Sequence, residues 1–129
     1  MKNNKPSNYK DWFKKADKNY KSAQLLLREG GPLVDICFFS HQIVEKYLKG
    51  ALVYFKKSPP KTHDLLALGS LLEEEVNDMD RVYSELENLN QYYLETRYPG
   101  FESDFEEKET KKAFEGAEEV RRFILDKTK

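Results

Sequence analysis

The segment CFFSHQIVEKYLKGALVYF, residues 37–55, constrains the fold more than any other part of the chain. At about 100° per residue, apolar side chains cover more than half the girth of this helix. They are Ile36, Ile43, Val44, Tyr47, Leu48, Ala51, Tyr54 and Phe55. Because so wide an apolar arc must be covered by neighbours on several sides, the sequence predicts a central helix in a bundle.

The rest of the chain has the apolar spacing of amphipathic helices, and no strand pattern competes with it. The first expected helix runs from Tyr9 to the helix-breaking residues 30–32, and the second runs from Leu33 to Lys57, before the prolines of SPP. The third runs from Asp64 to Val76, the fourth runs from Met79 to Thr96, and the last begins at Ser103. The sequence predicts Thr62 as the cap of the third helix and a capping box from Ser103 to Glu106 for the last. The predicted fold is all-α, a five-helix up-and-down bundle forming a single domain over residues 1–129.

Two of these helices have predicted inward faces that can be checked residue by residue. They are Leu65, Leu68, Leu71 and Leu72 in the third helix, and Met79, Val82, Leu86, Leu89 and Tyr93 in the fourth.

Composition restricts the possible chemistry. The only cysteine is Cys37, so no internal disulfide is possible. Without a leader or a long apolar run the expected location is the cytoplasm, away from membranes. Two histidines and one cysteine cannot make a Cys/His zinc site, and there is no glycine-rich phosphate loop, so we expect no metal and no cofactor.

Charge is distributed unevenly along the chain. Residues 1–28 carry eight Lys or Arg against two Asp, although the whole chain has a net charge of −1. The basic first helix is interpreted as a solvated, solubilising face, with a phosphate-facing surface as the alternative.

A polar stripe interrupts the second helix, and its members are Gln42, Glu45, Lys46 and Lys49. One explanation is a helix-stabilising pair between Glu45 and Lys49, four residues apart. The other is an interface, because Phe38 and Phe39 flank the stripe and exposed phenylalanines beside polar groups are typical of a contact with a second subunit.

Three segments in register, SHQIVEKYLKGAL, KTHDLLAL and YYLETRYPG, resemble the HEPN family, the higher eukaryote and prokaryote nucleotide-binding domains. The resemblance covers about Trp12 to Ile124. It implies an all-α homodimer whose partner is a minimal nucleotidyltransferase, as in toxin–antitoxin-like pairs. Its motif residues here are Gln42, Glu45, Thr62, His63 and Asp64.

Many members of the family that the chain resembles are metal-independent ribonucleases with an arginine followed, four to six residues later, by a histidine. Arg97 stands at the position of that arginine, but no histidine follows His63 in the chain. Cleavage through the 2′-hydroxyl of RNA needs a group that exchanges a proton near neutral pH. The usual enzymatic activity is therefore not predicted.

The candidate site residues follow from these arguments. Arg97, Lys46 and Lys49 are predicted phosphate contacts, with Tyr98 stacking or being modified. Phe38, Phe39 and His41 are predicted at the dimer surface, and His41 and His63 are the catalytic candidates. Three functions stay open: a nucleotide- or RNA-binding module, a divergent endoribonuclease using one of these histidines, and a non-catalytic structural adaptor.

Overall fold

The computed structural model describes residues 8–97 and 105–129, and within these ranges every regular element is helical. The elements are α1 (Tyr9–Glu29), α2 (Leu33–Tyr54), α3 (Leu65–Leu72), a 3₁₀ turn (Met79–Val82), α4 (Tyr83–Asn90), α5 (Tyr92–Glu95) and α6 (Glu107–Lys127). The predicted all-α bundle of five helices is confirmed, with the fourth divided into the 3₁₀ turn, α4 and α5.

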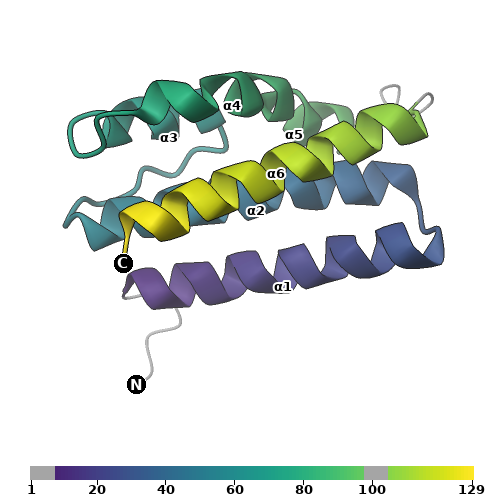
Figure 1. Cartoon of the computed structure of the whole chain (residues 1–129), viewed down its shortest axis with the longest axis horizontal. Coiled ribbons are helices and arrows are strands. Elements are labelled where there is room, and N and C mark those ends of the chain that lie inside the picture. Colours follow the sequence, from purple (N-terminus) through teal and green to yellow (C-terminus); the bar gives the residue numbers. More distant parts are fainter. Residues whose placement is uncertain (1–7, 98–104) are drawn as a thin grey trace.

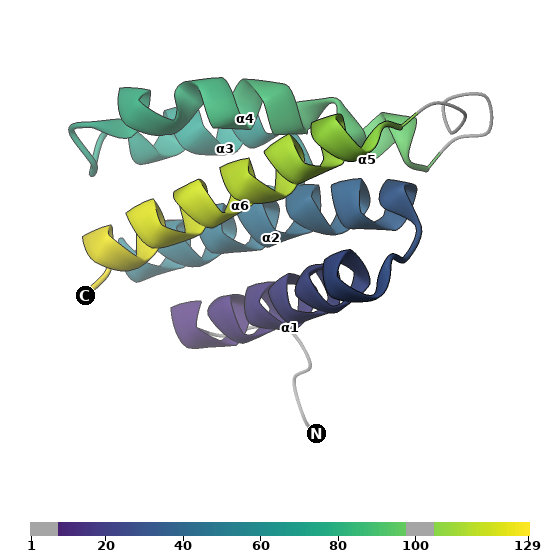
Figure 2. The same cartoon turned by 45° about the vertical axis from the view of Figure 1, so that its right-hand side comes forward.

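The bundle has three layers. In Figures 1 and 2, α2 and α6 lie between α1 on one side and α3, α4 and α5 on the other. Helix α2 contacts α1, α6, α3, α4 and α5, which is the central position that its apolar arc predicts. Among the described residues no helix is long and apolar enough to cross a membrane.

Helix ends differ from the expectation where local hydrogen bonding decides them. Helix α2 ends at Tyr54, before the prolines, because Lys56 takes a left-handed conformation with φ of 66°. The amides of Lys56 and Lys57 then donate to the carbonyls of Val53 and Leu52, at 2.9 and 2.8 Å, which closes the helix.

The predicted N-caps also change. Asp64, rather than Thr62, caps α3 by accepting hydrogen bonds from the amides of Leu66 and Ala67, whereas Thr62 accepts one from the amide of Asp64. In the capping box of α6, Glu106 pairs with Glu109. Ser103, the predicted cap, lies outside the described residues.

The buried faces of the third and fourth helices match the prediction except at two positions. Leu71 is 40% exposed, and Tyr92 is 1% exposed where Tyr93 was expected to be the inward residue. The helix is interrupted at Gln91, whose side-chain amide donates to the carbonyl of Asn88 at 2.8 Å. Tyr92 lies in the core, and Tyr93 lies at the surface layer.

Close approach of α1 and α2 at Gly50 yields a stability prediction. A Cβ atom there would lie 2.6 Å from Cε1 of Phe13, so Gly50→Ala should destabilise the fold by about 1–3 kcal/mol through overpacking. The matched control is Gly116→Ala in α6, where the nearest atom is 3.5 Å away and the better helix former should add up to about 1 kcal/mol. Urea denaturation of both variants measures this, and a Gly50→Ala protein as stable as the wild type would contradict it.

Candidate functional site

One ridge of α2 reaches the surface. Phe38, Gln42 and Lys46, at four-residue spacing, are partly exposed. Glu45 and Lys49 of the predicted stripe are only 4% and 7% exposed. The expectation that the whole stripe faces water or a second subunit is therefore wrong for these two residues, which are covered by their own chain.

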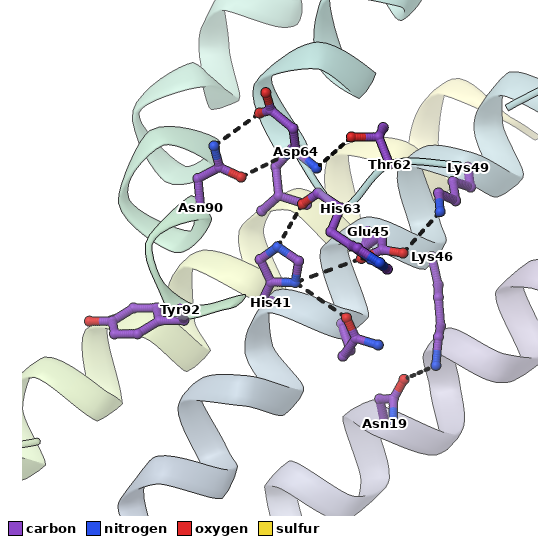
Figure 3. Close-up of polar contacts among 12 residues, drawn as sticks. Asn19, His41, Glu45, Lys46, Lys49, Thr62, His63, Asp64, Asn90 and Tyr92 are labelled. Atoms are coloured by element: carbon purple, nitrogen blue, oxygen red, sulfur yellow. Dashed lines mark hydrogen bonds and ion pairs between the residues drawn. The ribbon is translucent and has the colours of Figure 1, made fainter. Parts of the chain in front are cut away.

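Glu45 is the centre of a buried polar network (Figure 3). Its Oε1 accepts a hydrogen bond from Nδ1 of His63 at 2.9 Å, and its Oε2 accepts one from Nζ of Lys49 at 3.0 Å. The Lys49 ammonium also lies 5.7 Å from the ring centroid of Trp12 in α1. Two donors thus satisfy a carboxylate that would be costly to bury alone. The helix pair of Glu45 and Lys49 predicted from the sequence is present.

His41 is a buried support for the same network. Its side chain is inaccessible to solvent, and its Nε2 lies 2.9 Å from the carbonyl oxygen of His63. Burial lowers the pKa of His41 below its usual value, against the opposing charge of Glu45, so the ring is neutral at pH 7. Since a carbonyl oxygen only accepts, Nε2 carries the proton and donates it.

His63 is the exposed member of the network. About half of its side chain is accessible, at 49%, and its ring stacks on Tyr93 with centroids 4.0 Å apart and an interplanar angle of 13°. Nδ1 is used by Glu45, so Nε2 is the nitrogen left for chemistry. A half-exposed imidazole oriented by a carboxylate can accept or donate a proton at its free nitrogen.

Arg97 joins this cluster from the C-terminal end of α5. Its guanidinium carbon lies 5.0 Å from the ring centroid of Tyr93 and 5.9 Å from that of Phe38. Tyr93 therefore connects the exposed histidine to the exposed arginine. We call His63, Tyr93 and Arg97 the stacking site.

The segment that carries His63 is fixed by polar contacts on both sides. The side chain of Asn90 in α4 accepts from the amide of Leu65 at 2.8 Å and donates to Oδ1 of Asp64 at 3.0 Å. Together with the bond from His41, these contacts give the Thr62-His63-Asp64 motif a structural reason: they hold the backbone of His63 against α2.

The predicted site residues do not all meet. Lys46 donates to Oδ1 of Asn19 in α1 at 2.7 Å, and Lys49 is used by Glu45, so neither contacts the stacking site. At the predicted dimer surface, His41 has no exposed side chain, whereas Phe38 and Phe39 are both partly exposed and Phe39 also packs against the core. Tyr98 lies outside the described residues.

Within the described residues, no group of three or more His, Cys, Asp or Glu side chains could hold a metal ion.

The sequence does not predict Tyr93 as a site residue, because its position in a regular helix would face inward. Helix-breaking polar residues at Asn90 and Gln91 are the signal that could have found it.

Comparison with known proteins decides the family. The model of the HEPN domain matches residues 9–127. The chain belongs to the HEPN domain family. This assignment confirms the resemblance carried by the three sequence segments, and the matched range includes every residue of the stacking site.

Two solved structures resemble this HEPN domain over almost their full lengths. TT1696 from Thermus thermophilus has a TM-score of 0.83 and 26% identity, covering 92% of this chain and 97% of that one. ST0689, an archaeal HEPN homologue, has a TM-score of 0.76 and 22% identity, covering 96% and 100%, and shows the shared fold. A search of curated proteins finds no match.

Proposed function

We propose that this HEPN domain is a nucleotide- or RNA-binding module whose contact surface is the stacking site. The observation that carries the proposal is the continuous contact from His63 to Tyr93 to Arg97, with the imidazole and the guanidinium both accessible. Such a surface combines flat rings for a base with a forked donor for a phosphate.

The site is preorganised for this task. Tyr93 packs against His63, which is oriented by Glu45, so the rings do not have to be ordered when a base arrives. The guanidinium of Arg97 offers a planar fork of donors and is less strongly hydrated than a lysine ammonium. Binding then costs little rearrangement of the protein.

The wider setting of the proposal follows the family. The domain would act in the cytoplasm as a homodimer, with Phe38 as an accessible part of the subunit contact, and would pair with a minimal nucleotidyltransferase in a toxin–antitoxin-like system. The support is the position of Phe38 beside Arg97, which would set the stacking site at the edge of the dimer contact. In the structural-adaptor alternative, the stacking site would bind no nucleotide.

Removing the guanidinium tests the binding function. Arg97→Ala should weaken binding of adenosine 5′-monophosphate or a short RNA by about tenfold to a hundredfold, because a charge-assisted hydrogen bond contributes roughly 1.5–3 kcal/mol. Calorimetric titration measures the affinity, and circular dichroism should show unchanged helix content. Arg122→Ala is the control, since Arg122 is an exposed arginine of α6 paired with Glu119. Equal affinities for wild type and Arg97→Ala would reject the site.

A second candidate function is metal-independent RNA cleavage, and the bond between His63 and Glu45 favours it. With Nδ1 donating to the carboxylate, Nε2 of His63 would accept the proton of an RNA 2′-hydroxyl while Arg97 binds the phosphate. The 2′-oxygen would form a bond to phosphorus as the bond to the 5′-oxygen breaks, and the 5′-oxygen would take up the proton, giving a 2′,3′-cyclic phosphate and a 5′-hydroxyl end. His41, the other catalytic candidate, has no exposed atom with which to reach a substrate. His63 would thus take the place of the histidine missing after Arg97.

This candidate makes a separate prediction. The wild type should cleave single-stranded RNA in the presence of a chelator, and His63→Ala should abolish the cleavage because it removes the exposed imidazole beside Tyr93 that would accept the 2′-hydroxyl proton. An RNA lacking the 2′-hydroxyl is the control and should stay intact. Gel analysis of end-labelled RNA measures the products. Cleavage that survives in His63→Ala, or that occurs without the 2′-hydroxyl, would exclude the mechanism.

A further inference from the structure

The exposed ridge of α2 continues beyond the stacking site. It begins at Phe38, beside Arg97, and passes Gln42 to Lys46. Eight residues separate its ends, which corresponds to about 12 Å along the helix axis. The far end of the ridge therefore lies next to α1 and away from the cluster around Tyr93.

Positive charge gathers at that far end. Lys46 is partly exposed, and its ammonium is held toward α1 by the 2.7 Å bond to Asn19. Lys15, an exposed residue of α1, lies one helical turn before Asn19, the residue that Lys46 contacts. Burial, followed by the charges of Lys15 and Lys49, lowers the pKa of Lys46, although Glu45 opposes the shift. Glu45 lies nearby, but its two carboxylate oxygens accept from Lys49 and His63 and not from Lys46.

We propose that Lys15 and Lys46 form a second phosphate subsite, so that the ligand of this face is a single-stranded RNA several nucleotides long. The proposal rests on the proposed binding function and names its substrate class. A stacked strand advances about 3.4 Å per nucleotide, so the ridge of about 12 Å corresponds to roughly three to four nucleotides. A mononucleotide bound at Arg97 does not span that distance.

The chemistry of the whole face distinguishes RNA from other polyanions. An acidic protein segment would satisfy the two lysines, but it would bring no base to stack on the half-exposed ring of His63. A single strand supplies bases for the rings and phosphates for the cations at both ends. The basic first 28 residues, interpreted from sequence as a solvated face or a phosphate-facing surface, include Lys15.

The experiment compares ligands of two lengths. Binding of adenosine 5′-monophosphate and of an octamer of adenylate is titrated at several salt concentrations for the wild type and for Lys15→Gln/Lys46→Gln. The control is Lys108→Gln/Lys112→Gln, which removes two exposed lysines of α6. Glutamine at position 46 can still donate to Asn19, so the contact between α1 and α2 is retained.

The subsite predicts a length-dependent result. The wild type should bind the octamer at least about tenfold more tightly than the mononucleotide, and Lys15→Gln/Lys46→Gln should lose that gain while its mononucleotide affinity stays unchanged. The slope of log K against log salt should fall by about 1.4, since each lost phosphate contact on a single strand accounts for about 0.7.

Failure of the subsite differs from failure of the binding function. If the mononucleotide binds in an Arg97-dependent way but added length contributes nothing, the subsite is wrong and the binding function stands. A double variant that binds the octamer like the wild type, or a control that weakens binding equally, also overturns the subsite. If neither ligand binds the wild type, both proposals are wrong. Loss of an acidic protein partner, with octamer binding unchanged, would assign the lysines to that partner.

Discussion

A carboxylate removed from water must be paired, and the pairing of Glu45 organises the functional face of this domain. Its two oxygens accept from His63 on one side and from Lys49 on the other, while Lys49 in turn lies over Trp12. Removing one partner of a buried ion pair typically costs about 3–5 kcal/mol, because the remaining charge is left uncompensated. The central helix, the first helix and the segment before α3 are therefore tied together by one side chain.

This arrangement explains why so apolar a helix keeps a polar stripe. Half of the stripe, Glu45 and Lys49, is internal and connects three parts of the chain, while Gln42 and Lys46 remain at the surface. The HEPN motif residues likewise divide into a supporting residue and an exposed one. Asp64 belongs to the support, and His63 is the group that the support presents beside Tyr93. Residues that support the fold and residues that form the candidate site thus lie next to each other in the same segments.

Local sequence patterns predict the parts of this fold that depend on local forces. The apolar periodicity predicts the helices and the inward face of α2, because burying an apolar stripe determines them. The interruption at Gln91 escapes prediction because it depends on a side-chain amide competing for the backbone carbonyl of Asn88, and the apolar pattern does not decide which of Tyr92 and Tyr93 is buried. The left-handed residue Lys56 likewise ends α2 before any proline.

The contacts of the site are harder to predict because they join residues distant in sequence. Nothing near His63 in the sequence indicates that its Nδ1 meets Glu45, eighteen positions earlier, or that its carbonyl accepts from the buried His41. The sequence identifies these residues only through their resemblance to a family pattern. It predicts that Arg97 lies at the end of a helix and groups Lys46 and Lys49 with it, although both lysines bind other partners.

The tautomer of the exposed histidine tests most directly whether the glutamate orients it. Long-range proton–nitrogen correlation spectra of the folded domain, recorded at a pH where the ring is neutral, distinguish protonated from unprotonated ring nitrogens. Since a carboxylate only accepts, the account predicts that His63 carries its proton on Nδ1 and leaves Nε2 bare. A His63 ring protonated on Nε2 would contradict it, because the bond to Glu45 would then not exist.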